Sequence, residues 1–153
     1  MAQERIIRIL FVCHGNICRS PMAEYIMKHL VEKRGLSRTF MIDSAATSTE
    51  ELGNPVYPPA RRMLEAQGIG CGDHRARQIR RDEASEWDLI VVMDEANVRN
   101  IKRRIGESSR VYKLLEFAGE SRDVADPWYT GDFEATFDDC MAGCTGLLGY
   151  LGY

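Results

Sequence analysis

The run Cys13-His14-Gly15-Asn16-Ile17-Cys18-Arg19-Ser20-Pro21 decides how this chain folds. It follows an apolar stretch over residues 6–12, which is typical of a strand that is buried on both faces. It leads into a helical pattern over residues 21–34, where apolar pairs recur every four residues until Gly35. The sequence therefore predicts a strand, a tight loop and a helix N-terminus in direct succession.

The predicted loop has the properties of an anion site. Ser20 and Pro21 suit the N-cap and the first turn of the helix. A helix N-terminus gathers unpaired backbone N–H groups and the positive end of the helix dipole, so anions bind there readily. Gly15 permits unusual backbone angles, and Asn16 is of a type that tolerates the left-handed conformation. We expect the N–H groups of residues 14–19 to turn inward around one phosphate.

Two side chains distinguish this loop from an ordinary phosphate cradle. Arg19 can hold two phosphate oxygens at once through its planar guanidinium. Cys13 faces the donors of the loop and the helix N-terminus, which favour the thiolate, the nucleophilic form of cysteine. The loop therefore predicts phosphate chemistry on a cysteine. The alternative is that Cys13 is a buried core thiol in an ordinary strand–helix turn.

Strands and helices alternate along the rest of the chain. Short apolar runs predict strands over residues 40–44, 89–93 and 111–115, and Asp94 is expected to cap the helix after the second of these. This order predicts an α/β fold: a three-layer, open, four-stranded parallel sheet with helices on both faces and the phosphate-binding loop after the first strand. We expect residues 1–153 to form a single domain.

The last helix is predicted to begin near Phe133, with an apolar face that continues to Leu151. Gly143 and Gly146 interrupt it, and each glycine in a helix interior costs about 1 kcal/mol relative to alanine. The sequence therefore predicts that this helix is weak toward its C-terminal end.

The composition, 44% apolar and 28% charged residues, is that of a globular protein in water. The net charge of −3 gives no general reason to expect nucleic acid or a membrane surface as a partner. No apolar run approaches the roughly 18–20 residues of a membrane span, and the N-terminus lacks the apolar region of a signal peptide. We expect a cytoplasmic protein that is a monomer, with weak self-association at most.

Five cysteines in a chain without an export signal indicate reduced thiols rather than a disulfide scaffold. Cys13 and Cys18 have no matching second pair at zinc-finger spacing, so we expect no metal and no cofactor. Cys18 suggests regulation, because it could capture an oxidised Cys13 as a disulfide and protect it from irreversible oxidation. The alternative is that Cys18 is a small residue that packs the loop.

Residues 12–21 resemble the signature of the low-molecular-weight protein tyrosine phosphatases. The resemblance extends over nearly the whole chain, through Asp43-Ser44-Ala45-Ala46-Thr47-Ser48, Gly53-Asn54-Pro55, Ala76-Arg77-Gln78-Ile79, Met93-Asp94-Glu95 and Asp126-Pro127-Trp128. It implies a protein tyrosine phosphatase that hydrolyses phosphotyrosine and aryl phosphate monoesters through a phosphocysteine intermediate on Cys13. The implied partners are protein substrates that contain phosphotyrosine.

The resemblance also implies the catalytic roles of two further residues. Arg19 would stabilise the transition state, and Asp126 would protonate the leaving phenolate and then deprotonate the attacking water. From the residues alone, Asp126 is supported by its place in a polar loop beside Trp128 and Tyr129, which could form the wall of a site for a flat aryl group. The alternative for Asp126 is a solvated loop charge.

The same resemblance implies a group of residues that support the loop. Ser20 would donate a hydrogen bond to the sulfur of Cys13, and Asn16, Ser44 and His74 would form the network that holds the strained loop. From the residues alone, His74 reads more simply as a surface or structural histidine.

The pocket rim departs from the family pattern. The family usually carries an aromatic residue shortly after the segment that matches Thr47-Ser48, where this chain has Thr49-Glu50-Glu51. If Glu50 takes that place, one aromatic wall is missing, and acidic phosphopeptides would be disfavoured. Tyr57 is a candidate to replace the missing wall. Aryl phosphates are still expected to fit between Ile17 and the side formed by Trp128 and Tyr129.

Three other functions compete with this interpretation. Protein arginine phosphatases of the same fold tend to carry threonine where this chain has Ile17, and the apolar residue favours a phenyl ring. A thiol-dependent arsenate reductase needs further cysteines near the third strand, and residues 85–100 contain none. A non-catalytic phosphotyrosine-binding module would gain nothing from keeping Cys13, Arg19 and Asp126 together.

Overall fold

The computed structural model describes residues 5–153. Residues 1–4, which belong to the expected domain and to the N-terminal segment considered for a signal peptide, lie outside this range. The described strands are β1 (Ile7–Cys13), β2 (Phe40–Ala46), β3 (Leu89–Val92) and β4 (Val111–Lys113). The helices are α1 (Arg19–Lys33), α2 (Pro58–Ala66), α3 (Glu95–Ile105), α4 (Pro127–Thr130) and α5 (Phe133–Tyr150), with short 3₁₀ turns η1 (Glu83–Glu86) and η2 (Leu114–Ala118).

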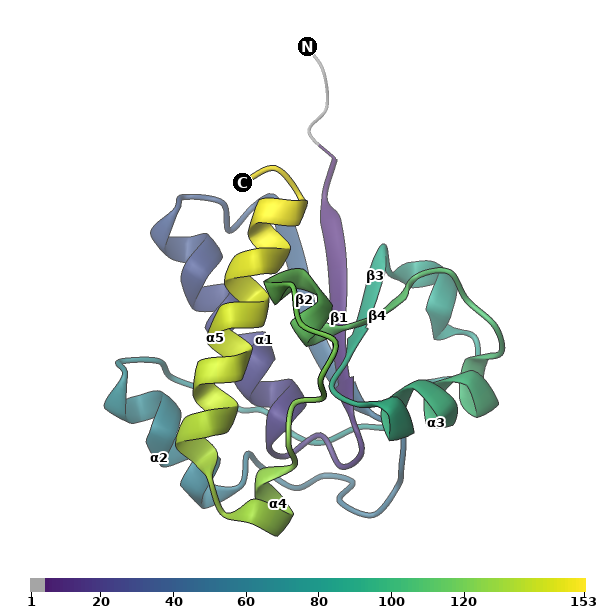
Figure 1. Ribbon diagram of the computed structural model, residues 1–153, viewed down its shortest axis with the longest axis horizontal. Helices are drawn as coiled ribbons and strands as arrows, with labels where there is room; N and C mark the ends of the chain where they lie inside the picture. The colour runs from purple at the N-terminus through teal and green to yellow at the C-terminus, as the bar shows by residue number, and fades with distance from the viewer. Residues whose placement is uncertain (1–4) are drawn as a thin grey trace.

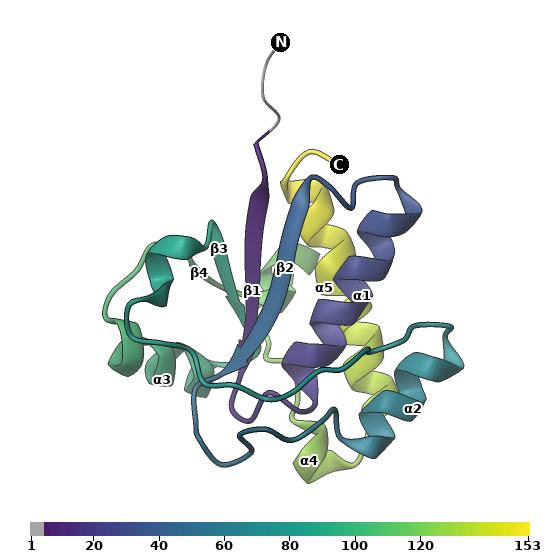
Figure 2. The same ribbon diagram turned by 180° about the vertical axis from the view of Figure 1, so that it is seen from behind.

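The four strands form one parallel sheet in the order β2-β1-β3-β4, as the alternation of strands and helices predicts. Helices α1, α2 and α5 lie on one side of the sheet, and α3 lies on the other (Figures 1 and 2). Successive side chains of a strand point to opposite faces. Ile9 and Phe11 of β1 therefore pack in the core with α1 and α5, while Leu10 and Val12 pack in a second core under α3.

The fourth strand is shorter than predicted. It ends at Lys113, and Leu114 and Leu115 begin the 3₁₀ turn η2 instead. An apolar run of this length is compatible with either structure, because both bury the same residues. The two leucines are fully buried in the core that α5 covers, so the prediction of a strand over residues 111–115 was wrong at its end.

The N-cap of α3 is the residue that the sequence predicts, whereas the N-cap of α1 is not. Asp94 caps α3 as predicted: its Oδ1 accepts from Asn97 N–H at 2.7 Å, and Asn97 Oδ1 accepts from Asp94 N–H at 3.2 Å. Helix α1 begins at Arg19, so its N-cap is Cys18, which offers no side-chain cap. The expectation that Ser20 is the N-cap was wrong, because its hydroxyl lies instead 3.0 Å from the sulfur of Cys13.

The glycines of α5 have a packing role that the sequence did not reveal. The helix is continuous to Tyr150, and it packs against η2. A Cβ atom at Gly146 would lie 2.6 Å from the carbonyl carbon of Phe117 and closer still to its oxygen. Gly143 approaches Leu114 in the same way. The two glycines therefore let η2 approach the helix closely.

Replacing Gly146 with alanine is expected to lower the free energy of unfolding by about 1–3 kcal/mol, because the new methyl group overlaps backbone atoms that cannot move aside cheaply. Gly149 lies in the same helix with open space around it. The matched variant Gly149→Ala is expected to stabilise by about 0.5–1 kcal/mol through helix propensity. Urea denaturation of both variants measures the difference, and equal effects would contradict the packing role of Gly146.

No helix within residues 5–153 is both long enough and apolar enough to cross a membrane.

Candidate active site

The loop that joins β1 to α1 lies at the carboxyl end of the sheet, where open parallel sheets bind ligands. It borders a pocket of about 130 Å³. In Figure 1 this end of the molecule is opposite the C-terminus. The pocket is lined by Cys13, His14, Gly15, Ile17, Cys18, Arg19, Glu50, Glu51, Asp126, Trp128 and Tyr129.

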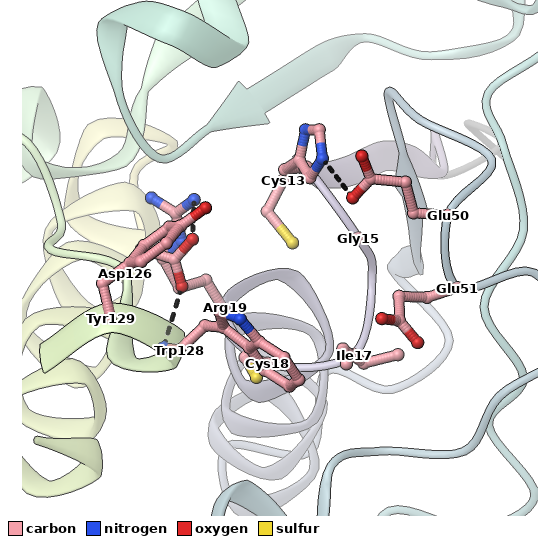
Figure 3. Close-up of a pocket in the computed structure, with 11 residues that line it drawn as sticks. Cys13, Gly15, Ile17, Cys18, Arg19, Glu50, Glu51, Asp126, Trp128 and Tyr129 are labelled. Atoms are coloured by element: carbon pink, nitrogen blue, oxygen red, sulfur yellow. Dashed lines mark hydrogen bonds and ion pairs between the residues drawn. The ribbon is translucent and has the colours of Figure 1, made fainter. Parts of the chain in front are cut away.

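Cys13 ends β1 and turns its sulfur toward the centre of the pocket (Figure 3). Only 4% of the residue is exposed. The Sγ atom lies 3.0 Å from Ser20 Oγ, and the N–H groups of Asn16 and Ser20 donate to it at 3.3 and 3.5 Å. Donors on three sides favour a negatively charged sulfur at this position.

The strained residue of the loop is Asn16. It is the one non-glycine residue with a positive φ, 60°, among residues 5–153. Gly15 does not adopt a left-handed φ, so the expectation that it supplies the unusual backbone angle was wrong. A Cβ at Gly15 would lie 3.4 Å from the Cγ atom of Glu51, which makes this a tight position for a side chain.

Asn16 is the centre of a buried hydrogen-bond network. Its Nδ2 donates to Ser20 Oγ and to Ser44 Oγ, both at 2.9 Å, and its Oδ1 accepts from Arg77 N–H at 3.2 Å. His74 Nε2 donates to the backbone carbonyl of Asn16 at 2.7 Å. The structure thus brings together the four residues expected to support the loop. A left-handed asparagine persists only when its surroundings hold it in place.

Glu24 completes this network, and no expectation from the sequence included it. The side chain is buried in α1, and its Oε1 accepts from Ser44 Oγ at 2.5 Å. Lys28 donates to Oε2 at 2.6 Å, and His74 Nδ1 lies 3.9 Å from Oε1. A carboxylate on the buried face of a helix, one turn before a lysine, is the signal that could have revealed it.

Arg19 is 2% exposed and is held by groups from distant elements. Its Nη1 donates to Asp94 Oδ2 at 2.7 Å and to the carbonyl of Val124 at 2.9 Å. Burial alone would lower the pKa of Arg19, but the nearby Cys13, Asp94 and Asp126 outweigh it and raise that pKa above its ordinary value. The guanidinium therefore stays charged, with its orientation set on one side by Asp94.

Asp94 was predicted only as a helix cap, yet its two oxygens have different partners. Oδ1 caps α3 through Asn97 N–H, and Oδ2 accepts from Arg19. The first contact is local and readable from the sequence. The second joins residues that are 75 positions apart, so no local pattern indicates it.

Asp126 is the N-cap of the short helix α4. Its Oδ1 accepts from Trp128 N–H at 3.0 Å, and its Oδ2 lies 3.5 Å from Arg19 Nη2. The loop that precedes α4 thus carries a carboxylate to the same pocket as Cys13 and Arg19. The arrangement places a nucleophile, a cation and a possible proton donor around one small cavity.

The rim of the pocket combines aromatic and acidic side chains. Trp128 and Tyr129 are 53% and 84% exposed. In Figure 3, Tyr129 lies on the same side of the pocket as Asp126, while Glu50 and Glu51 lie on the opposite side. Glu51, which was not predicted, lines the pocket as Glu50 does. Tyr57 does not line it but packs behind Trp128, with ring centroids 5.0 Å apart.

His14 and Glu50 form a hydrogen bond on this rim, with Nε2 and Oε2 2.8 Å apart. Ile17 lines the pocket and packs with Cys18 and Ala76.

Burial, with smaller contributions from Cys13 and Asp126, raises the pKa of Cys18 to about 12. Cys18 therefore remains a thiol near neutral pH. Among residues 5–153 no group of three or more His, Cys, Asp or Glu side chains is placed to hold a metal ion.

Comparisons with known proteins identify the family of the chain. Residues 8–152 match the family model described as low molecular weight phosphotyrosine protein phosphatase. The chain is 37% identical over 147 residues to the low molecular weight protein-tyrosine-phosphatase YfkJ of Bacillus subtilis, which covers 94% of each protein. The crystal structure of YfkJ superposes with a TM-score of 0.94, at 36% identity, over 98% of this chain and 97% of that one.

A drosophila arginine phosphatase, DARP, has a related structure, with a TM-score of 0.85 at 28% identity over 96% of this chain and 99% of that one. The fold is thus compatible with more than one phosphorylated side chain. The family model and the YfkJ match nevertheless cover almost the whole chain at substantial identity. The chain therefore belongs to the low molecular weight phosphotyrosine protein phosphatase family.

Proposed function

We propose that this enzyme hydrolyses phosphotyrosine in proteins, and aryl phosphate monoesters in general, through a phosphocysteine intermediate on Cys13. The observation that carries the proposal is the shared pocket, in which the buried sulfur of Cys13 faces backbone N–H donors beside Arg19 and Asp126. Neither a metal nor a cofactor has a part in these steps.

In the first step the thiolate of Cys13 attacks phosphorus. The S–P bond forms while the bond from phosphorus to the phenolic oxygen breaks, and Asp126, as the carboxylic acid, gives its proton to that oxygen. The N–H groups of residues 14–19 and the guanidinium of Arg19 hold the three remaining phosphate oxygens. Since Asp94 and Val124 occupy Nη1 of Arg19, phosphate would be held by its Nε and by its Nη2, which lies 3.5 Å from Asp126 Oδ2.

In the second step a water molecule attacks the phosphorus of the phosphocysteine. The carboxylate of Asp126 accepts a proton from this water, the P–S bond breaks, and inorganic phosphate leaves with the thiolate restored. Ser20 donates to the departing sulfur. Asn16, Ser44 and His74 position the loop and do not touch the substrate.

An aromatic substrate is favoured by the walls of the pocket. Ile17, Trp128 and Tyr129 line it, and they offer apolar surface to a phenyl ring. We expect phosphotyrosyl peptides to be hydrolysed with a kcat/KM at least about tenfold higher than matched phosphoarginyl peptides, because the charged guanidinium would lose solvation against these walls. A panel of such peptide pairs tests the proposal. Faster hydrolysis of the phosphoarginyl member would instead favour a protein arginine phosphatase.

A regulatory role of Cys18 is a second part of the proposal. Peroxide would oxidise the thiolate of Cys13 to a sulfenic acid, and the sulfur of Cys18 would then form a disulfide and release water. Both residues line the pocket. The high pKa of Cys18 leaves little thiolate at neutral pH, so we expect disulfide formation to become faster as the pH rises.

Mass spectrometry after mild peroxide treatment, with Cys18→Ser as the control, measures this outcome. A Cys13–Cys18 link is expected in the unaltered chain, and sulfinic or sulfonic acid on Cys13 is expected in the control. If the unaltered chain also accumulates the sulfonic acid without any link, Cys18 is only a packing residue.

The proposed setting is the cytoplasm, with the chain acting as a single-domain monomer on protein substrates and without nucleic-acid or membrane partners. All five cysteines are unpaired and buried, which suits a reducing compartment.

A further inference from the structure

A second hollow of about 360 Å³ lies beside the active-site pocket, and its lining combines arginines with His14 and the neutral polar residues Thr47, Ser48, Gln78 and Asn100. We call this hollow the arginine groove, because three arginines contribute to its lining: Arg81, Arg103 and Arg104. Arg81 lies shortly after Gln78, which pairs with Ala46 at the end of β2. Arg103 and Arg104 lie in the last turn of α3. Three guanidinium groups around one hollow form a local positive site on a chain whose net charge is −3.

The walls of this groove are tied together by hydrogen bonds. Ile79 N–H donates to the carbonyl of Ala46 at 2.9 Å, and Gln78 Nε2 donates to the carbonyl of Thr47 at 2.9 Å. Arg104 Nε donates to the carbonyl of Ile79 at 2.8 Å, which fixes its guanidinium in place. Arg104, which is already held in place, therefore loses less side-chain entropy when it binds a ligand.

The arginines of the groove lack counter-ions. Within residues 5–153, none of the three forms a salt bridge, whereas Arg80 pairs with Asp82, Glu83 and Glu86. Arg103 Nη1 donates to the neutral side-chain oxygen of Asn100 at 3.3 Å. The groove therefore has positive charge available for an incoming anion.

The groove adjoins the active site through His14, which lines both hollows. The hydrogen bond between His14 and Glu50 lies on the rim between them. The active-site pocket itself carries Glu50 and Glu51, so the rim is acidic on one side and the neighbouring groove is basic. A substrate that extends across His14 would pass from the acidic rim to the basic groove.

We propose that the arginine groove binds a carboxylate side chain close to the phosphotyrosine of a peptide substrate, and so selects acidic phosphopeptides. The proposal rests on the proposed tyrosine phosphatase function and names its substrate class. It reverses the expectation from Glu50 alone, because that carboxylate accepts a hydrogen bond from His14, whereas no carboxylate within residues 5–153 pairs with the arginines. Opposite charges that meet in this way give specificity and faster association more than raw affinity.

The test uses pairs of phosphotyrosyl peptides that differ only in Asp or Glu against Asn or Gln, on the N-terminal or the C-terminal side of the phosphotyrosine. We expect the acidic member of at least one pair to have a kcat/KM about three- to tenfold higher, mainly through KM. The ratio should approach one in about 1 M salt, where the Debye length falls to about 3 Å.

The double variant Arg81→Gln/Arg103→Gln is expected to remove this preference, as judged by the ratio within each peptide pair. The matched control is Arg34→Gln/Arg38→Gln, which removes the same charge from two exposed residues at the far end of α1. If the unaltered chain hydrolyses the acidic and the neutral member of every pair with equal kcat/KM, the inference is overturned. It is also overturned if the control variant loses the preference for acidic peptides to the same extent. If p-nitrophenyl phosphate and every phosphotyrosyl peptide resist hydrolysis, the proposed function itself fails.

Discussion

Replacing Cys13 with serine is expected to lower the kcat for p-nitrophenyl phosphate by more than about 10⁴-fold, because a serine hydroxyl at neutral pH is a far weaker nucleophile than a thiolate. The donors around the sulfur, Ser20 Oγ at 3.0 Å and two backbone N–H groups, can stabilise a charged sulfur but cannot ionise an alcohol. Initial rates with and without a metal chelator measure the effect. The chelator should leave the unaltered enzyme as active as before.

The matched control is Cys71→Ser, which changes another buried thiol away from the pocket. Burial raises the pKa of Cys71, so this thiol is not a ready nucleophile. We expect the control to retain activity and the Cys13 variant to keep its circular dichroism spectrum. Substantial turnover by the Cys13→Ser variant would rule out the phosphocysteine mechanism.

Replacing Asp126 with alanine is expected to slow the hydrolysis of phenyl phosphate by about 10²–10⁴-fold, the range of general acid catalysis. The loss should be much smaller for p-nitrophenyl phosphate, since p-nitrophenolate leaves without needing a proton. Asp126 lies in the pocket with its Oδ2 3.5 Å from Arg19, so it is near the phosphate site. Rates over a series of phenols of increasing pKa measure this dependence.

Two further variants separate proton transfer from helix capping. Asp126→Asn keeps an oxygen that can accept from Trp128 N–H, yet it has no acidic proton, so it should show the same dependence on the leaving group. Asp132 caps α5 through Ala135 N–H, outside the pocket. Asp132→Ala is expected to cost about 1 kcal/mol of stability without that dependence. A uniform loss for all leaving groups in the Asp126 variants would show that another residue is the acid.

The predictions from sequence were most accurate where the determinants lie close together in the chain. The capping box of Asp94 and Asn97 needs residues three positions apart, and β1 needs only its own apolar run. The end of β4 was predicted wrongly because burial of Leu114 and Leu115 is the same in a strand and in a 3₁₀ turn. The 3₁₀ turn that forms lies close against α5 at Gly143 and Gly146, a tertiary contact outside the run itself.

The role of Ser20 shows the same limit within the loop. A serine at this position can cap a helix or bind another group, and local sequence favours the cap. In the folded chain Cys13 and Asn16 lie within hydrogen-bond distance of its hydroxyl, and the helix starts earlier. Local propensity therefore assigned Ser20 to the wrong contact, a helix cap, whereas the contact with the sulfur of Cys13 that the family resemblance implies is present at 3.0 Å.

The amino-acid sequence was enough to specify the anion-binding loop, its thiol and its arginine, because these features depend on neighbours within one strand–loop–helix unit. The partners of Arg19, by contrast, lie 75 and 107 positions away in Asp94 and Asp126. Ser44 and His74 reach Asn16 of the loop from two further segments, and both also contact Glu24 of α1. Folding alone brings such groups together, since their contacts are set by the packing of the sheet and helices and leave no periodic mark in the chain.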